Sequence, residues 1–456
     1  MLRSHCVSKI RAAEEIVGET SGWDNLMQTA AAGLAENLSD IPAGELVLML
    51  IGPGNNGGDA LFAATHLLNR GVRVDLALLD ENKVHKAGLS AAQAAGAQIV
   101  SGPAGHLWVV DGLFGIGSQG GLEGLAAQWA QEIDDAFVIA VDVPSGIGVD
   151  SGRSEGIHIW AQRTVTFGTH KNCHLVSPAA SACGEIRFVD IGLLPHLGEP
   201  DLEAIDVEDG YLLDSVIPIP EDHKYTRGVV SIAAGSVEYA GAAHLCVAGA
   251  LGGTAGMVRF VGTPELTARV VDRAPEVVGV SGQVQAWVVG SGGGADTEKH
   301  LAAALADEVP CVIDAQALQF VRPAQHIVLT PHSGELAQML DCERDEIESD
   351  PLHFVQVAAE KYDATVLLKG VRTLIATPGH PTRVNLSGNP WLATAGAGDV
   401  LAGFIGSLLA SGMDCHEAAS VGAYLHGFAA DLVAGPLRAS DIAEMLPMAF
   451  TEWGQI

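Results

Sequence analysis

Apolar segments of strand length alternate with helical patterns along most of the chain. In the first half the apolar segments lie at 45–52, 72–79, 107–115, 136–146, 163–168 and 184–192, and helices are expected from about Asp59 to Asn69, near 84–95 and at 122–133. The second half resumes the alternation with segments at 229–236, 285–293, 310–318, 326–335 and 365–370, a small-residue helix from Gly241, and helices that begin at Gly398 and His416. This order predicts the α/β class, with parallel sheets covered by helices on both faces.

The acidic, proline-bearing segment 195–220 interrupts this alternation. A chain of 456 residues has the length of two domains. Because the two halves share no repeat of fixed period, we expect two unlike domains, one at 1–200 and the other at 201–456.

Charge and hydropathy limit the partners that the chain could have. The sequence holds 24 Lys and Arg against 55 Asp and Glu, a net charge of −31. Such a chain repels phosphate backbones, so nucleic acid is not expected as a partner. A nucleotide site would have to be assembled locally from backbone N–H groups, helix N-termini and a few cations.

The sequence also favours a protein of the cytoplasm without a membrane span. The longest apolar stretches, such as 45–51, are far shorter than the about 20 residues that a span requires. The N-terminus shows no apolar core of a signal peptide. The seven cysteines are scattered and form no C-x-x-C motif, which is typical of reduced thiols.

Polar residues follow three strands of the first half where each strand ends. The loop GPGNNGGD at 52–59 precedes a helix, and its glycines let backbone N–H groups approach an anion; an ordinary tight turn is the alternative. Asp111 and Asp142 end two further apolar runs, where each could instead cap the next helix. Ligands of such sheets bind at the carboxyl ends of strands, and a buried carboxylate needs a cation, a donor or a substrate. Together the three strand ends predict a polar pocket.

The second half has a comparable set of residues. Small residues at 395–398 expose a helix N-terminus, which is an anion site. Asp399 in the first turn either stabilises the helix dipole or, as a base, takes a proton from a hydroxyl group that attacks phosphorus. Lys369 is either a surface lysine or a nucleotide contact. His332 is either structural or a ligand contact, at the same predicted sheet edge as Lys369 and Asp314.

The motifs of the first half resemble the N-terminal domain of NAD(P)H-hydrate epimerases. GPGNNGGDA, DGLFGIG, AVDVPSG and TVTFGTHK carry this resemblance over roughly residues 10–195. It implies a Rossmann-like, three-layer fold that interconverts the R and S epimers of hydrated NADH and NADPH (NADHX and NADPHX), with a bound potassium ion. The implied ion ligands are Asn56, Asp111 and Ser145, whose oxygen atoms suit an alkali cation.

The same resemblance assigns the substrate contacts of the first domain. Epimerisation at the hydrated carbon needs proton transfer, so Asp142 is the expected catalytic acid or base. The implied substrate-binding residues are Asn55, Asn56, Gly57, Gly58, Asp59, Gly115, Ile116, Gly117, Ser118, Gln119, Gly120, Gly121 and Asp142.

The motifs of the second half are similar to those of the ADP-dependent NAD(P)H-hydrate dehydratases, in the ribokinase-like superfamily. HKYTRG, AGS…GAA, TPHSGE, LKGVRT and NPWLATAGAGD cover about residues 210–450. The resemblance implies that ADP phosphorylates the hydroxyl group of the hydrate, giving AMP, and that loss of phosphate restores the nicotinamide ring; Mg²⁺ would neutralise the phosphates. The implied catalytic base is Asp399, the substrate contacts are Ala242, Gly292, His332 and Asp399, and the nucleotide contacts are Lys369, Gly370, Val371, Arg372, Thr373 and Gly398.

Four positions depart from the family patterns. Ala60 replaces a usual glycine, Gln162 a common aspartate, Ser291 a usual proline and Gln316 the second aspartate of VDADAL. Ala60 and Gln162 leave the substrate contacts of the first domain undecided. Gln316 affects a polar contact near Asp314.

Because both resemblances belong to one pathway, the sequence indicates a bifunctional enzyme acting on NADHX and NADPHX, expected to form a homo-oligomer. Two alternatives remain: a ribokinase-like kinase for a vitamin precursor with a degenerate N-terminal domain, and a non-catalytic nucleotide-binding protein. The sequence does not decide whether ADP or ATP is the phosphate donor.

Overall fold

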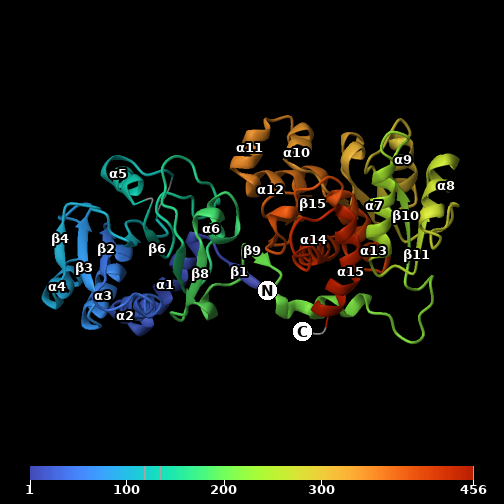
Figure 1. Ribbon diagram of the computed structural model, residues 1–456. Helices are drawn as coiled ribbons and strands as arrows, with labels where there is room; N and C mark the ends of the chain where they lie inside the picture. The colour runs from blue at the N-terminus through green and yellow to red at the C-terminus, as the bar shows by residue number, and fades with distance from the viewer. Residues whose placement is uncertain (118–119, 134, 455–456) are drawn as a thin grey trace. The chain divides into compact units, whose positions relative to one another are not determined.

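The computed structural model describes residues 1–117, 120–133 and 135–454. It divides the chain into two compact units (Figure 1), one of Arg3–Leu202 and the other of Met1–Leu2 together with Glu203–Ile456. None of the helices in these described stretches is long and apolar enough to cross a membrane.

The first unit is built on a seven-stranded sheet in the order β4-β3-β2-β5-β6-β7-β8. All of its strand pairs are parallel, as predicted. The strands are β2 (Leu46–Ile51), β3 (Arg73–Leu78), β4 (Gln98–Val100), β5 (Trp108–Gly112), β6 (Phe137–Val141), β7 (Arg163–Phe167) and β8 (Glu185–Val189). The continuous apolar runs of β2, β5 and β6 are buried because helices cover both faces.

Helices α1 to α4 bury their apolar residues on one face of this sheet and α5 on the other. The helices are α1 (Val7–Ser21), α2 (Trp23–Glu36), α3 (Asn55–Asn69), α4 (Lys86–Ala95), α5 (Gly124–Glu132) and the short α6 (Asn172–Leu175). The predicted start of α3 near Asp59 is wrong. Gly54 turns the chain at φ +86°, and the following Asn-Asn-Gly-Gly sequence already forms the first turn of the helix.

A ten-stranded sheet has the order β1-β9-β17-β16-β15-β14-β13-β12-β10-β11. Its strands are β1 (Leu2–Ser4), β9 (Leu202–Ala204), β10 (Val229–Ala233), β11 (Met257–Phe260), β12 (Ala286–Val289), β13 (Cys311–Ile313), β14 (Ile327–Leu329), β15 (Thr365–Leu368), β16 (Thr373–Ala376) and β17 (Thr382–Asn385). Strands β10 to β17 belong to the second unit, whereas β1 and β9 fall where the chain passes from one unit to the other. The pairs from β11 through β10 to β15 are parallel, whereas β15, β16 and β17 are antiparallel neighbours that the sequence analysis did not predict.

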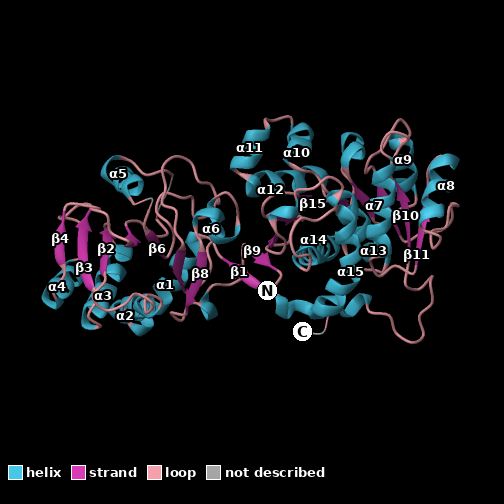
Figure 2. Cartoon of the chain, viewed as in Figure 1, coloured by secondary structure: helices cyan, strands magenta, loops and turns pink. Residues whose placement is uncertain are grey.

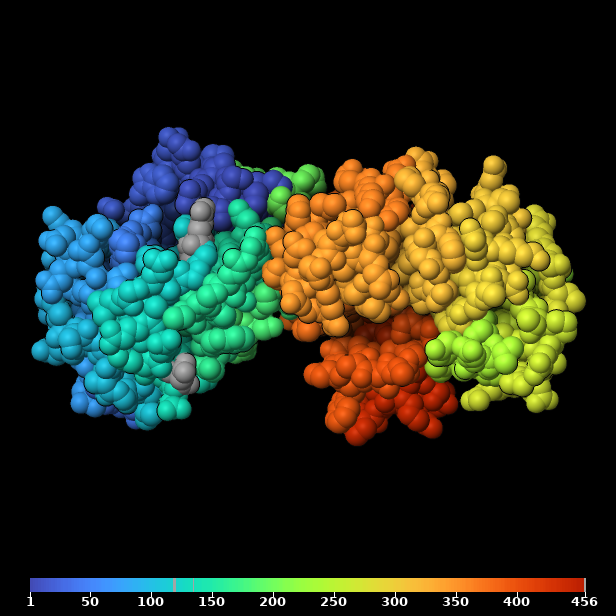
Figure 3. All heavy atoms as spheres, turned by 90° about the horizontal axis from the view of Figure 1, so that it is seen from above, coloured from blue at the N-terminus to red at the C-terminus, as the bar shows by residue number. Residues whose placement is uncertain are grey.

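Helices cover both faces of this second sheet as well (Figure 2). They are α7 (Ala240–Leu251), α8 (Pro264–Arg273), α9 (Thr297–Ala306), α10 (Ser333–Leu340), α11 (Arg344–Ser349), α12 (Pro351–Tyr362), α13 (Ala397–Ala410), α14 (Cys415–Asp431) and α15 (Ala439–Trp453). The face of the second unit that is visible in Figure 3 is formed mostly by the yellow and orange segments, which include α9 to α12. Helix α13 is buried from Val400 to its end and forms the centre of the core.

Small residues allow α13 to lie directly against α7. A Cβ atom at Gly403 would lie 1.9 Å from the backbone carbonyl oxygen of Cys246, and one at Gly249 would lie 2.1 Å from that of Val400. Both obstacles are backbone atoms, so a side chain there could be accommodated only by moving a helix.

We therefore expect Gly403→Ala to lower the free energy of unfolding of the second unit by about 1–3 kcal/mol, the usual cost of overpacking. Chemical denaturation followed by circular dichroism measures it. The matched control is Gly241→Ala, because a Cβ atom at Gly241 meets no atom within 4 Å. Equal effects of the two substitutions would contradict this account of the α7–α13 contact.

Candidate active sites

A cavity of about 710 Å³ opens at the carboxyl ends of the strands of the first unit. Seven of the predicted site residues line it: Asn55, Asn56, Asp59, Gly115, Ile116, Gly117 and Asp142. Arg11, Glu14 and Lys171 also line it, and the sequence analysis gave none of them a role.

The other predicted contacts of this unit lie elsewhere or are not described. Gly57 and Gly58 are buried in the first turn of α3, where a Cβ atom at Gly57 would lie 2.3 Å from the carbonyl oxygen of Gly52. Gly120 lines an adjoining cavity of about 540 Å³, and Gly121 packs against the backbone at 155–157. Ser118 and Gln119 fall outside the described residues.

Asp142 follows β6 with φ +68°, a left-handed conformation that is unusual for a residue other than glycine. Its Oδ1 atom accepts hydrogen bonds from the Lys171 ammonium group, from Thr166 Oγ1 (3.1 Å) and from the Phe167 amide (3.2 Å). Among the described residues, every donor to this carboxylate reaches Oδ1 and none reaches Oδ2, and Asp142 lines the pocket.

Lys171 is 1% exposed and forms a buried ion pair with Asp142. Its ammonium group donates three hydrogen bonds, to Asp142 Oδ1, to Thr166 Oγ1 (2.9 Å) and to the carbonyl of Phe167 (2.9 Å). With all three protons engaged, Lys171 acts on the site through the orientation and charge of Asp142.

Two further carboxyl groups share the pocket with Asp142. Burial raises the pKa of Asp59 well above its usual range, and the charges of Asp142 and Glu14 raise it further. Burial and then the charge of Asp142 raise the pKa of Glu14, while Lys171 and Arg11 oppose the shift. The pocket therefore combines a carboxylate paired with a lysine and carboxyl groups that hold protons more tightly than usual.

The three predicted ion ligands lie around the end of β5. Asp111 Oδ1 accepts from Ser145 Oγ (2.7 Å), and Oδ2 accepts from the Ser145 amide (2.8 Å). Ser145 Oγ also accepts a hydrogen bond from the amide of Phe114. The side chain of Asn56 lies against the next residue of the same loop, since a Cβ atom at Gly115 would lie 3.0 Å from Asn56 Oδ1. Desolvation of the fully buried carboxyl raises the pKa of Asp111 to about 6.

The two departures in this unit lie outside the residues that line the pocket. Ala60 is fully buried, and a Cβ atom at Gly112 would lie 2.7 Å from its methyl group. Gln162 pairs with the backbone of Val138, since its Oε1 atom accepts from that amide at 2.6 Å.

In the second unit, Asp314 and Lys369 meet at the carboxyl ends of β13 and β15. Asp314 Oδ1 accepts from Lys369 Nζ (3.0 Å) and from Thr330 Oγ1 (2.8 Å). Its Oδ2 atom accepts from Ser291 Oγ (2.8 Å), so the serine that replaces the usual proline adds a hydrogen bond here. The exposed Gln316 leaves this network intact. Asp314 positions Lys369, a role that sequence reasoning did not assign.

Asp399 faces the same group of charges from the first turn of α13. Burial raises its pKa to about 6, the charge of Asp314 adds to the shift, and Lys369 opposes it. A Cβ atom at the neighbouring Gly398 would lie 3.3 Å from Lys369 Nζ. The predicted base, the predicted lysine and the helix N-terminus therefore lie together.

The remaining predicted contacts of this unit lie after β12, β14 and β15 and at the start of α7. His332 and Lys369 form an isolated parallel β-bridge. The Nδ1 atom of His332 accepts a hydrogen bond from the Glu335 amide (3.1 Å), and this bond caps α10. Gly292 packs on Ala242, because a Cβ atom at Gly292 would lie 2.4 Å from the Ala242 methyl group. Gly370, Val371 and Arg372 form the turn between β15 and β16, and Thr373 begins β16.

Two α/β units, each with ionisable side chains at the carboxyl ends of its parallel strands, define the class as a two-site α/β enzyme. The family model described as "NAD(P)H-hydrate dehydratase" matches residues 230–447. The model described as "YjeF-related protein N-terminus" matches residues 23–173.

Curated relatives are similar over nearly the whole chain. The bifunctional NAD(P)H-hydrate repair enzyme Nnr of Mycobacterium tuberculosis (strain ATCC 25618 / H37Rv) is 40% identical, over 92% of both chains. The enzyme of the same name from Mycobacterium leprae is 38% identical, over 97% of this chain and 96% of its own. The chain belongs to the family of bifunctional NAD(P)H-hydrate repair enzymes.

A solved structure supports the fold of the second unit. A ribokinase-like superfamily protein from Enterococcus faecalis V583 matches with a TM-score of 0.50 and 23% identity, covering 56% of this chain and 98% of its own. This likeness confirms the predicted ribokinase-like fold. Family membership over both units favours the bifunctional enzyme over the vitamin-precursor kinase and the non-catalytic protein.

Proposed function

We propose that the first unit interconverts the epimers of NADHX and NADPHX and that the second dehydrates the S epimer at the expense of ADP. The observation that carries this proposal is common to both units. Each sets an aspartate at a strand end or helix start near a lysine, Asp142 beside Lys171 and Asp399 near Lys369. Two separate proton-transfer sites are what the two reactions require.

In the first unit, Asp142 Oδ2 is the atom we assign to proton transfer. Lys171 and two further donors fix the other oxygen, so the free oxygen keeps one orientation. The amide-rich start of α3 and the turn at 115–117 would hold the polar groups of the dinucleotide.

Asn56, Asp111 and Ser145 are the residues that would hold potassium. The donor set fits the ion, since it offers amide, carboxylate and hydroxyl oxygens. Asp111 is buried, and among the described residues no cationic side chain contacts it. When bound, the ion would neutralise this carboxylate and fix the loop that follows β5.

In the second unit, Lys369 and the N-terminus of α13 would bind the phosphates of ADP. Asp399 takes the proton from the hydroxyl group of the hydrate as its oxygen attacks the terminal phosphorus, and AMP leaves. Glu335, whose carboxylate lies 3.9 Å from Lys369 Nζ, offers oxygen atoms that would hold Mg²⁺, the counter-ion of the phosphates.

The test is incubation with mixed NADHX epimers, with and without ADP, at low and high potassium. We expect NADH to reappear only with ADP, first from the S epimer and then from the R epimer at a rate set by epimerisation. Replacing potassium with choline should slow the second phase alone. A stable phosphorylated product without NADH would contradict the assignment of the second unit.

A variant pair separates the ion from the rest of the site. Ser145→Ala removes one proposed ligand and should raise the potassium concentration needed for half-maximal epimerisation. Ser181→Ala, at an exposed position of the same unit, should leave it unchanged. An identical potassium requirement in both variants would count against the proposed ligand set.

A further inference from the structure

Helix α1 contributes one wall of the pocket in the first unit, although it lies before the segment that the family model matches. The helix buries Ile10, Ala13 and Val17 against the core. Arg11 and Glu14, three positions apart, share a face of the helix, and both line the pocket.

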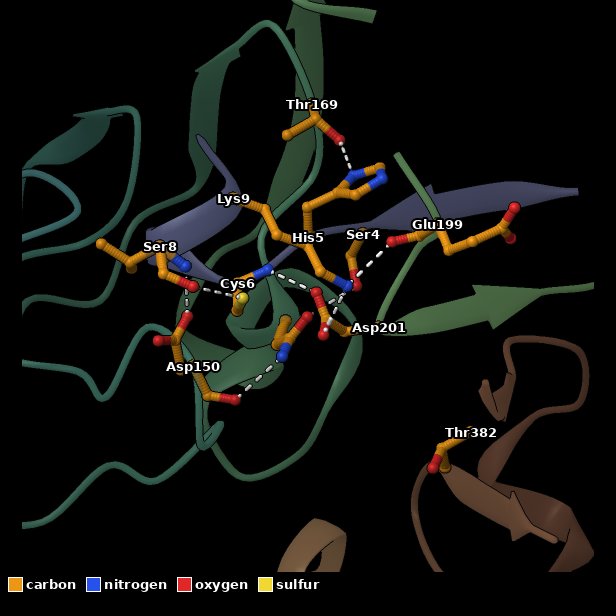
Figure 4. A network of polar contacts seen from close by, with 12 residues as sticks. Ser4, His5, Cys6, Ser8, Lys9, Asp150, Thr169, Glu199, Asp201 and Thr382 are labelled. Carbon is orange, nitrogen blue, oxygen red and sulfur yellow. Dashed lines mark hydrogen bonds and ion pairs between the residues drawn. The ribbon is translucent and has the colours of Figure 1, made fainter. Parts of the chain in front are cut away.

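The start of α1 is anchored by side chains of its own unit (Figure 4). The Cys6 amide donates to Asp201 (2.8 Å), and the Val7 amide donates to Asp150 (2.7 Å). Lys9 Nζ also reaches Asp201, at 3.0 Å. The helix is therefore held in place at the end that precedes Glu14, as a positioned acid or base must be.

Glu14 differs from Asp142 in how its charge is compensated. Among the described residues no side chain forms an ion pair or a hydrogen bond with its carboxyl group, which is half-buried at the pocket wall. Asp142, Asp59, Lys171 and Arg11 are the charged groups that face it. Burial and then the charge of Asp142 raise the pKa of the Glu14 carboxyl, whereas Lys171 and Arg11 lower it.

The reaction assigned to this unit requires such a second group. Hydration of the nicotinamide ring places a hydroxyl group on the carbon next to the ring nitrogen. Inversion there requires that oxygen to leave from one face of the ring and another to add on the opposite face. Departure consumes a proton and addition releases one, so two groups in opposite protonation states serve one inversion.

We propose that Glu14 is a second acid/base residue of the epimerase site, paired with Asp142; this rests on the proposed function of the first unit. Glu14 donates its proton to the hydroxyl oxygen as the C–O bond breaks, the electron pair leaves with the water formed, and the nitrogen lone pair forms a C=N bond. Water adds to the other face, the C=N electron pair returns to nitrogen, and its proton passes to Asp142. Exchange with solvent restores both groups.

The experiment compares Glu14→Gln with Glu15→Gln in the full chain. Glu15 is the next residue of α1, is exposed and does not line the pocket. With R-NADHX as substrate and the epimer ratio followed by NMR, Glu14→Gln should lower kcat by about 100-fold or more and change KM less than about threefold. Glu15→Gln should match the parent enzyme.

The pH profile and a conservative variant separate catalysis from structure. In the parent enzyme kcat should fall at high pH, where Glu14 loses its proton, and Glu14→Asp should retain part of the rate and the same limb. The limb should be absent in Glu14→Gln, while ADP-dependent use of S-NADHX by the second unit is retained.

Two results would overturn the inference: a kcat for Glu14→Gln within about threefold of the parent, or a loss confined to KM. If the parent enzyme itself does not epimerise, the proposed function of the first unit fails instead, and the two failures are distinguishable. Unfolding of Glu14→Gln at lower temperature than Glu15→Gln would assign its loss to structure and also count against the inference.

Discussion

Asp399→Asn should reduce ADP-dependent turnover of S-NADHX by about 10²–10⁴-fold, the usual contribution of a general base. Asparagine has the shape of aspartate but cannot take the proton from the attacking hydroxyl group. Because Lys369 and the N-terminus of α13 remain, KM for ADP should change little. Epimerisation in the first unit should proceed at the parent rate, which shows that the variant is folded there.

The pH dependence gives a second, independent reading of Asp399. Burial and the charge of Asp314 raise its pKa to about 6, so the carboxylate that serves as base is lost as the pH falls through that value. We expect kcat/KM for dehydration to fall about tenfold for each pH unit below this point. Asp214→Asn, at an exposed position, is the control. A profile that stays level between pH 7 and 5, or an Asp399→Asn variant with half of the parent rate, would refute this role.

The sheets could be predicted because their strands are buried on both faces. Runs such as that of β2 need no alternation to be recognised, and their order relative to helices dictates parallel pairing. Helices α1 and α2 were missed, since their composition is mixed and no glycine-rich loop marks their start. The antiparallel pair of β16 and β17 was also missed, because it interrupts the strand–helix alternation.

The candidate sites divide along the same line. The positions of Asp111, Asp142 and Asp399 could be predicted because the ends of buried strands and the starts of helices can be recognised in the sequence. Lys171 and Glu14 could not, since their roles come from contacts across the fold. Lys171 lies in the TVTFGTHK motif, so a lysine just after a buried strand was the one available signal.

Lys171→Met should destabilise the first unit by about 3–5 kcal/mol, the range measured when one partner of a buried ion pair is removed. Methionine fills much of the same volume, so the cost comes from the charge that Asp142 keeps without a cation. The Thr166 hydroxyl and the Phe167 amide remain as its donors. Hydrogen exchange of the amides in β6 and β7, measured by mass spectrometry, reports the free energy of unfolding of this unit.

Lys83→Met is the matched control, because Lys83 pairs with Asp80 at the surface, where 70% of the lysine side chain is exposed. Such pairs contribute about 0–1 kcal/mol. A second substitution tests the cause of the larger loss. The double variant Lys171→Met/Asp142→Asn should recover part of the stability at pH 8 but no epimerase activity. A deficit that the second substitution does not reduce would mean that Lys171 stabilises the unit by packing alone.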